Sequence, residues 1–219
     1  KAGILGMFPS VKGAPISVIH ESSNRSHFRP VVDADLLAAV QAKYKLPSSP
    51  YFLTLSTLEP RKNLLRTIKA FDRLAKSQPE LDLALVICGK RGWKIDEILE
   101  AENIDYDNIY FTGYVDEGDL PVLYSHTLAL CYISLYEGFG LPPLEAMACG
   151  TAVIYGDNSS MPEIIGDGGL PADASDIESI VSQMLRMLDD TLREEMNDKA
   201  IKRAHQFSWL KTAYETLNA

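Results

Sequence analysis

Short apolar runs alternate with amphipathic segments along most of the chain. The apolar runs have the length and composition of buried strands, and they fall at 51–56, 81–88, 109–111, 128–135 and 152–155, with a weaker candidate at 16–19. Helices are expected at 33–44, 64–74, 94–102, 116–125, 145–149, 175–188, 190–205 and 209–217, and a loop with a short helix at 158–165. The helical spacing of apolar residues is explicit at 33–44 and 64–74, and the helices 175–188 and 190–205 are amphipathic. Strands that alternate with helices predict an α/β fold, with a Rossmann-like, mostly parallel sheet that carries helices on both faces.

Residues at the ends of several helical segments are typical caps. Asp33, Asn63 and Ser208 stand directly before helical patterns, so we expect them as N-caps. Gly150 follows the short helix 145–149 and is expected at the position just past its end. Such residues satisfy backbone groups that the first and last turns of a helix leave without partners.

Polar clusters follow the predicted strands at the points where the strands end. They lie at 57–63, 89–93, 112–115 and 136–141. In open parallel sheets, ligands bind outside the carboxyl ends of the strands. The clusters therefore predict one binding site at this edge of the sheet.

A glycine turn with two carboxylates follows the apolar run 128–135. Glu137 is followed by Gly138, Phe139 and Gly140, and Glu145 comes one turn into the next predicted helix. Glycine permits a ligand to approach the backbone closely, and a helix N-terminus can bind an anion. Spacing alone leaves a second interpretation equally open, in which the turn is ordinary and Glu145 only complements the helix dipole, worth about 0.3–1 kcal/mol.

Arg61 and Lys62 lie between the first strand and a helix that starts near Asn63. A guanidinium fork, an ammonium group and free helix N–H groups together suit a diphosphate. The alternative is a solvated surface pair, which is the usual state of two adjacent basic residues. The position of the pair at a strand's carboxyl end favours the diphosphate site.

Composition narrows the class of protein. The 219 residues are enough for one large domain or two small ones, and with 46% hydrophobic and 23% charged residues the chain can bury a sizeable core. A net charge of −9 argues against general nucleic-acid binding, which needs a basic surface. Any phosphate site is therefore expected as a local basic island.

Cysteine usage and hydropathy indicate the compartment. Cys88, Cys131 and Cys149 are odd in number and lie in apolar or small-residue surroundings, so we expect buried free thiols in a reducing cytoplasm. No apolar run approaches the ~18–20 residues of a membrane span, and no secretory signal opens the chain. We expect a cytoplasmic protein, at most peripheral at the inner membrane face. The chain starts at Lys1 without Met, which suggests a piece of a longer protein.

The string 135–151 resembles the retaining glycosyltransferases of family 4, whose E-x7-E motif corresponds to Glu137 and Glu145. The stretch E-P-R-K-N at 59–63 is similar to the family's donor-diphosphate motif, and a weaker match covers 161–169. The resemblance extends from about residue 16 to the C-terminus. It implies that the chain is the C-terminal, donor-binding half of a GT-B fold.

The resemblance also implies roles for individual residues. Arg61 and Lys62 would stabilise the departing nucleoside diphosphate, Glu137 would bind the donor sugar hydroxyls, and Glu145 would accept hydrogen bonds from both ribose hydroxyls. The backbone around the glycine turn would contact the sugar or the distal phosphate, through Gly138, Phe139, Gly140 and Leu141. The nucleoside would lie against Gly113, Tyr114, Val115 and Lys90, with Arg91 and Trp93 nearby.

The resemblance predicts the domain organisation and partners. Residues 1–30 would be a linker and remnant of an N-terminal domain, 31–207 the nucleotide-sugar-binding domain, and 208–219 a helix that crosses back. The donor would be a GDP- or UDP-linked hexose, with a preference for GDP-mannose, and the acceptor a glycan or lipid-linked sugar. Transfer would retain the anomeric configuration without a metal. The isolated domain is expected to bind donor with little or no activity.

Other functions have weaker support. Paired carboxylates occur in glycosidases, but hydrolysis needs neither the basic pair nor the glycine turn. Two D-x-D strings, at 33–35 and 105–107, are interpreted as a helix start and a turn, and the histidines show no metal-ligand spacing. The absence of G-x-G-x-x-G leaves a dinucleotide oxidoreductase unsupported. A GT-B epimerase or phosphorylase and a non-catalytic nucleotide-sugar-binding module remain alternatives.

Overall fold

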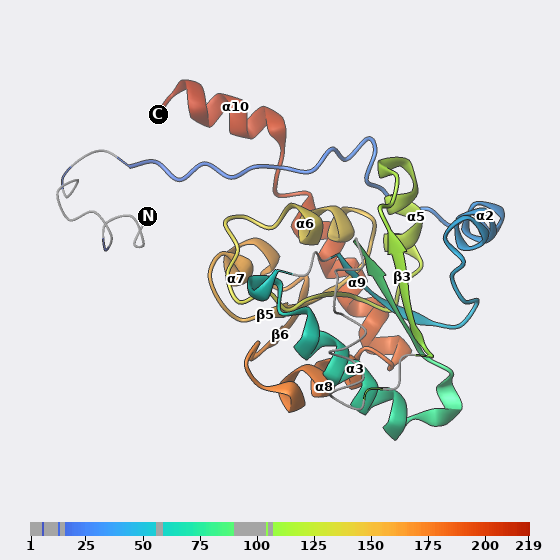
Figure 1. Ribbon diagram of the computed structural model, residues 1–219. Coiled ribbons are helices and arrows are strands. Elements are labelled where there is room, and N and C mark those ends of the chain that lie inside the picture. Colours follow the sequence, from blue (N-terminus) through green and yellow to red (C-terminus); the bar gives the residue numbers. More distant parts are fainter. Residues whose placement is uncertain (1–5, 7–12, 14–15, 56–58, 90–103, 105–106) are drawn as a thin grey trace.

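The computed structural model describes residues 6, 13, 16–55, 59–89, 104 and 107–219 (Figure 1). Several predictions therefore fall outside the described residues. They are the helix at 94–102, the nucleoside contacts Lys90, Arg91 and Trp93, and the first aspartate of the second D-x-D string.

The described residues form one parallel sheet with the strand order β3-β2-β1-β4-β5-β6. The strands are β1 (Tyr51–Leu55), β2 (Ala84–Cys88), β3 (Ile109–Gly113), β4 (Leu130–Tyr132), β5 (Val153–Gly156) and β6 (Gly169–Ala172). The chain moves outward from β1 to β3, then returns to the other side of β1 and continues to β6. The order thus reverses between β1 and β4, which is where such sheets bind ligands.

Helices cover both faces of this sheet, as predicted (Figure 1). The α-helices are α2 (Ala34–Tyr44), α3 (Leu64–Ser77), α5 (Leu120–Ser125), α6 (Leu141–Ala148), α7 (Met161–Ile165), α8 (Ile177–Arg186), α9 (Asp190–Ala204) and α10 (Trp209–Leu217). Short 3-10 turns are η2 (Pro60–Lys62), η3 (Pro79–Leu81) and η4 (Glu117–Asp119). The predicted segment 116–125 is therefore divided between η4 and α5.

Successive residues of each central strand enter different cores. Leu53 packs in the core beneath α5, α6 and α9, whereas its neighbour Phe52 packs in the core beneath α3 and α8. Both side chains are fully buried. Because adjacent side chains of a strand point to opposite faces, a strand that is apolar throughout requires a covered sheet on both sides. This explains the continuous apolar runs in the sequence.

Two strand predictions were wrong. Residues 16–19 are described but form no strand. Conversely, β6 was missed because Gly169 and Pro171 are residues that strands disfavour. The structure explains the glycine, since a Cβ atom at Gly169 would lie 2.2 Å from the carbonyl oxygen of Val153 in the neighbouring strand. The close approach of the two backbones therefore requires glycine at position 169.

The predicted caps at Asp33 and Ser208 are confirmed. The Asp33 side chain accepts hydrogen bonds from the backbone N–H groups of Asp35 and Leu36, and Ser208 accepts one from Lys211. Gly150 lies just past α6 with a φ of +83°, as its predicted role requires. The first aspartate of the D-x-D string at 33–35 is thus a helix cap.

The segment 16–30 and the C-terminal helix α10 contact each other. The Thr212 hydroxyl of α10 donates to the carbonyl oxygen of His20 at 2.6 Å. Both segments project from the same side of the sheet body (Figure 1). The domain boundaries at 30 and 208 remain predictions.

Candidate functional site

Three of the predicted site residues meet at the carboxyl edge of the sheet. In η2, Arg61 Nη1 lies 3.0 Å from Glu137 Oε2, and Lys62 Nζ lies 2.7 Å from Glu137 Oε1. Glu137 is 8% exposed. The two cations therefore hold one buried carboxylate between them, although they stand more than seventy positions away in the sequence.

The charges of this cluster explain the state of Glu137. Burial by itself raises the pKa of the Glu137 carboxyl, but hydrogen bonds from Lys62 and Ser134 and the charges of Lys62 and Arg61 outweigh burial. The pKa of Glu137 is therefore lowered. The Arg61 guanidinium also lies 3.1 Å from Glu59 Oε2, so two acids share the half-exposed arginine.

The backbone of η2 is fixed to the end of β4. The backbone N–H of Leu135 donates to the Arg61 carbonyl at 2.7 Å. The buried Asn63 side chain donates to the carbonyl oxygens of Ile133 at 3.0 Å and Ala174 at 2.7 Å. These bonds join three segments behind the basic pair.

The predicted capping role of Asn63 was wrong in one respect. Asn63 does occupy the N-cap position of α3, but its side chain makes no cap hydrogen bond. Its backbone adopts φ +56°, a left-handed conformation that asparagine tolerates better than most residues. The amide group is instead occupied by Ile133, Ala174 and Arg66. Asn63 thus acts as a bridge between strand ends.

Lys62 is held from a second side by Tyr132. The ammonium group lies 2.9 Å from the tyrosine hydroxyl and 4.9 Å from the ring centroid. Burial raises the pKa of this hydroxyl first, and the nearby Glu137 charge raises it further. Tyr132 was not singled out from the sequence, because a tyrosine within an apolar run looks like an ordinary core residue.

The glycine turn connects Glu137 to α6. Gly140 is the N-cap residue of α6 with φ +108°, and a Cβ atom there would lie 2.5 Å from Met161 Cε. The Ser160 hydroxyl donates to the carbonyl oxygens of Glu137 and Phe139, and the Glu137 N–H donates to Ser159 Oγ. The residues after β5 therefore fix the shape of the turn.

The start of α6 offers fewer N–H groups than most helices. Pro142 and Pro143 occupy the second and third positions of the helix, and proline has no backbone N–H. Leu144 N–H already donates to the Gly140 carbonyl. Any anion or hydroxyl bound here must therefore be contacted by the turn and by Leu141.

Glu145 lies on α6 and contacts Tyr124 of α5. The Tyr124 hydroxyl donates to Glu145 Oε2 at 3.1 Å. Burial raises the pKa of the Glu145 carboxyl, and the hydrogen bond from Tyr124 partly opposes this effect. The two glutamates of the E-x7-E string thus have pKa values displaced in opposite directions.

A pocket of about 310 Å³ lies at the carboxyl ends of β1, β2 and β3. Its lining includes the predicted Gly113, Tyr114 and Val115 together with Lys62, which also belongs to the Glu137 cluster. Gly89, from the predicted polar cluster 89–93, also lines the pocket. Residues not predicted for the site complete the lining, namely Leu55, Cys88, Leu120 and Pro142. Leu55 and Cys88 are the last residues of β1 and β2. Their position at the carboxyl ends of strands could have identified them as residues of the site.

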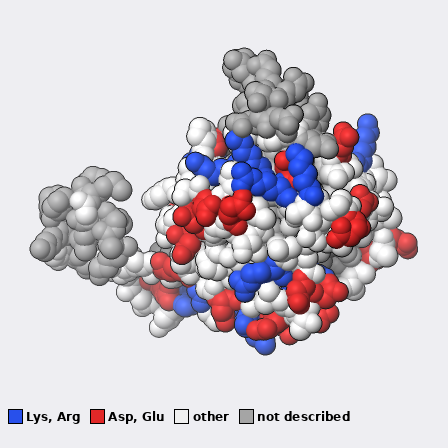
Figure 2. Space-filling view, turned by 90° about the horizontal axis from the view of Figure 1, so that it is seen from below, with Lys and Arg blue, Asp and Glu red and all other residues white. Residues whose placement is uncertain are grey.

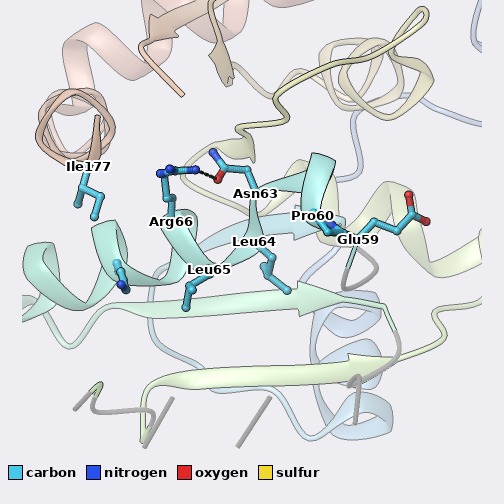
Figure 3. A pocket seen from close by; sticks show the side chains of 8 residues that line it. Glu59, Pro60, Asn63, Leu64, Leu65, Arg66 and Ile177 are labelled. Carbon is cyan, nitrogen blue, oxygen red and sulfur yellow. Dashed lines mark hydrogen bonds between the residues drawn. The ribbon is translucent and has the colours of Figure 1, made fainter. Parts of the chain in front are cut away.

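A larger pocket of about 460 Å³ lies between the start of α3 and Ile177 of α8 (Figure 3). Leu64 and Leu65 contribute apolar surface, and Arg66 points to the Asn63 side chain, whose oxygen accepts its hydrogen bond. This pocket shares Glu59 and Pro60 with the segment before Arg61.

The face seen in Figure 2 carries acidic and basic side chains in mixed patches. Among the residues that the structure describes, no three His, Cys, Asp or Glu side chains are grouped to hold a metal ion.

Comparison with known proteins identifies the family. Residues 39–207 match the family described as Glycosyl transferases group 1. The chain belongs to this family. It is 38% identical over 197 residues to O-antigen chain mannosyltransferase B of Escherichia coli, covering 89% of this chain and 51% of that protein. It is 29% identical over 200 residues to a GDP-mannose-dependent α-(1-6)-phosphatidylinositol monomannoside mannosyltransferase of Mycolicibacterium smegmatis, covering 85% and 51%.

The structural comparison agrees. Sucrose-phosphate synthase from Thermosynechococcus elongatus superposes with a TM-score of 0.80 at 25% identity, covering 99% of this chain and 54% of that one. The predicted α/β fold and the resemblance to a GT-B glycosyltransferase are confirmed. The narrower assignment to family 4 stays a prediction. The group 1 chain spans about half the length of the curated relatives described above.

Proposed function

We propose that this chain is the donor-binding half of a retaining hexosyltransferase that transfers mannose from GDP-mannose. The observation that carries the proposal is the joint position of Arg61, Lys62 and Glu137 beside a pocket at the carboxyl edge of β1–β3. The names of the mannosyltransferase relatives, one of them GDP-mannose-dependent, support the sugar and the base.

The nucleoside enters the pocket of about 310 Å³ and the diphosphate extends along its Lys62 wall. Backbone groups of Gly113, Tyr114 and Val115 contact the base. Glu145 accepts from the ribose hydroxyls, because a carboxylate facing a vicinal diol can accept two hydrogen bonds. Lys90 borders the nucleoside in this proposal and lies outside the described residues.

Donor binding exchanges the partners of the basic pair. A diphosphate carries more negative charge than one carboxylate, so Arg61 and Lys62 turn from Glu137 toward the phosphates. The Glu137 carboxylate is then available to the sugar hydroxyls, beside the backbone of Gly138, Phe139, Gly140 and Leu141. When the glycosidic bond of the donor breaks, Arg61 and Lys62 stabilise the charge on the departing diphosphate.

The chemistry needs no metal in this proposal, since two cationic side chains offset the diphosphate charge. Attack on the same face of the sugar retains the configuration. The acceptor, a glycan or lipid-linked sugar, is bound together with an N-terminal GT-B domain. We place the reaction in the cytoplasm, because Cys88, Cys131 and Cys149 are buried free thiols. No helix in the described part of the chain is long and apolar enough to cross a membrane.

Calorimetric titration of the 219-residue chain with GDP, UDP and ADP tests the proposal. GDP is expected to bind with a dissociation constant of about 10 μM to 1 mM and more tightly than the other two. Arg61→Ala should weaken GDP binding at least about tenfold. Arg73→Ala is the matched control, because Arg73 is an exposed arginine of α3 that pairs with Glu178 on α8.

If Arg61→Ala and Arg73→Ala change the affinity for GDP equally, Arg61 does not bind the diphosphate and the proposed diphosphate site is wrong. Equal affinity for all three nucleotides would remove GDP as the donor base while leaving the site. Transfer itself is measured with a chain extended to the length of the relatives, GDP-mannose and a lipid-linked glycan. Inversion at the anomeric carbon of the product contradicts the retaining mechanism.

A further inference from the structure

We infer that the Tyr124 hydroxyl positions the Glu145 carboxylate for the ribose hydroxyls of the donor. This inference rests on the proposed function and adds a residue to its site. Tyr124 lies on α5 and its side chain is fully buried, so it acts through Glu145 and not on the donor itself.

Tyr124 is one of the largest fully buried side chains of the protein. Its ring packs edge-on against Phe28 at 6.2 Å between centroids, and its carbonyl oxygen accepts a hydrogen bond from the Thr151 hydroxyl. The ring therefore has little freedom. A buried tyrosine hydroxyl normally takes a partner, and here the partner is the carboxylate of Glu145 at 3.1 Å.

The hydrogen bond makes the two carboxylate oxygens of Glu145 inequivalent. Oε2 of Glu145 accepts from Tyr124, whereas Oε1 accepts no hydrogen bond from the residues that the structure describes. A glutamate on a helix has several rotatable bonds, and one anchored oxygen restricts them. The remaining lone pairs are then presented in a fixed direction, as contact with two adjacent hydroxyls requires.

The same bond favours the ionised form of the carboxyl group. Burial raises the pKa of Glu145, and the Tyr124 hydrogen bond lowers it. Removal of the hydroxyl therefore raises the pKa further. The other titratable groups that act on Glu145 or respond to it come from different elements, namely Glu117, His27, Tyr132 and Cys149. These groups stay unchanged when only the Tyr124 hydroxyl is deleted.

The test compares GDP with 2′,3′-dideoxy-GDP, which lacks both ribose hydroxyls. The ratio of their dissociation constants reports the ribose contact, and it is measured on the folded fraction of each variant. Wild-type protein should prefer GDP about tenfold or more. In Tyr124→Phe and in Glu145→Gln the preference should fall to about twofold or less, with no further fall in the double variant. Tyr51→Phe is the matched control, because its equally buried hydroxyl donates to the Leu123 carbonyl and lies outside this contact.

Measuring the GDP preference at a series of pH values distinguishes a positioning role of Tyr124 from a purely structural one. A purely structural role would leave the pH dependence of this preference unchanged. The GDP preference depends on ionised Glu145 and is lost as the pH falls through its pKa. In Tyr124→Phe the residual preference should disappear at a higher pH than in the wild type. Tyr51→Phe should follow the wild-type curve.

Three outcomes overturn the inference in distinguishable ways. If Tyr124→Phe keeps the wild-type preference, or weakens both ligands by the same factor, Tyr124 is only a core residue and the proposed donor site stands. If Glu145→Gln alone loses the preference, Glu145 contacts the ribose without help from Tyr124. If wild-type protein does not prefer GDP, the ribose role of Glu145 fails and the positioning role fails with it.

Discussion

The ammonium nitrogen of Lys62 lies 2.7 Å from Oε1 of Glu137, and the tyrosine hydroxyl of Tyr132 contacts the same ammonium group. The basic pair is thus held by a carboxylate. This arrangement keeps two cations together in an otherwise acidic protein. In the proposed function, binding of a diphosphate releases Glu137.

The first prediction concerns Glu137→Gln. The substitution removes the charge that pairs with Lys62, so the free energy of unfolding should fall by about 1–3 kcal/mol at neutral pH. The pKa of Glu137 is lowered in the folded state, so its stabilising effect is present above the unfolded pKa and lost as the pH falls through the folded value. Urea unfolding measured from about pH 7 down to about pH 3 should therefore show the two proteins converging at acid pH.

Glu195→Gln is the control for this experiment, because Glu195 pairs with Lys199 on the exposed face of α9. It should leave the free energy of unfolding nearly unchanged, because an exposed ion pair contributes little to stability. A constant difference between wild type and Glu137→Gln at every pH would contradict the electrostatic explanation.

The second prediction concerns Glu59, which lies 3.1 Å from the Arg61 guanidinium. Glu59 competes with a bound diphosphate for Arg61. Glu59→Gln should therefore tighten GDP binding about two- to threefold at low salt, and the gain should shrink as the ionic strength rises. Glu80→Gln, an exposed acid in η3, should leave GDP binding unchanged. Weaker binding in Glu59→Gln would show that Glu59 holds Arg61 in its binding position.

The third prediction tests the bridge formed by Asn63. Asn63→Gly keeps the positive φ available and removes the amide donors to Ile133 and Ala174. Two buried carbonyl groups lose their partners, so stability should fall by about 2–4 kcal/mol and GDP affinity should fall as η2 loosens. Lys45→Gly is the matched control, since Lys45 also has a positive φ but caps α2 through its backbone. That variant should be neutral or slightly stabilised in urea unfolding, and an equal loss in both variants contradicts the bridge.

Strands β1 to β5, the caps at Asp33 and Ser208 and the gathering of polar residues at one edge of the sheet could be predicted because they depend on local patterns. Alternating strands and helices required parallel connections, and polar residues followed the strand ends. Asp33 and Ser208 cap helices through neighbours only two or three positions away. Interactions of this kind are contained in a short piece of sequence.

Features that depend on distant partners could not be predicted. The role of Asn63 is set by Ile133 and Ala174, and nothing near Asn63 in the sequence indicates them. The contact between Tyr124 and Glu145 joins two helices, and a tyrosine among apolar residues resembles core. The strand β6 forms because Val153 offers its backbone, despite unfavourable residues in β6 itself. In each case tertiary pairing outweighs local preference.

The last prediction compares two glycines of one turn. Gly140 has φ +108° and its added Cβ atom would lie 2.5 Å from Cε of the fully buried Met161, whereas a Cβ atom at Gly138 meets nothing within 4 Å. Gly140→Ala should therefore cost about 1–3 kcal/mol of stability and weaken donor binding, because the start of α6 must shift. Gly138→Ala should stay within about 0.5 kcal/mol of the wild type. Thermal unfolding and GDP-mannose titration of both variants provide the measurement. If Gly138→Ala keeps stability but loses GDP-mannose while binding GDP normally, the sugar itself approaches Gly138, as the proposed donor geometry requires.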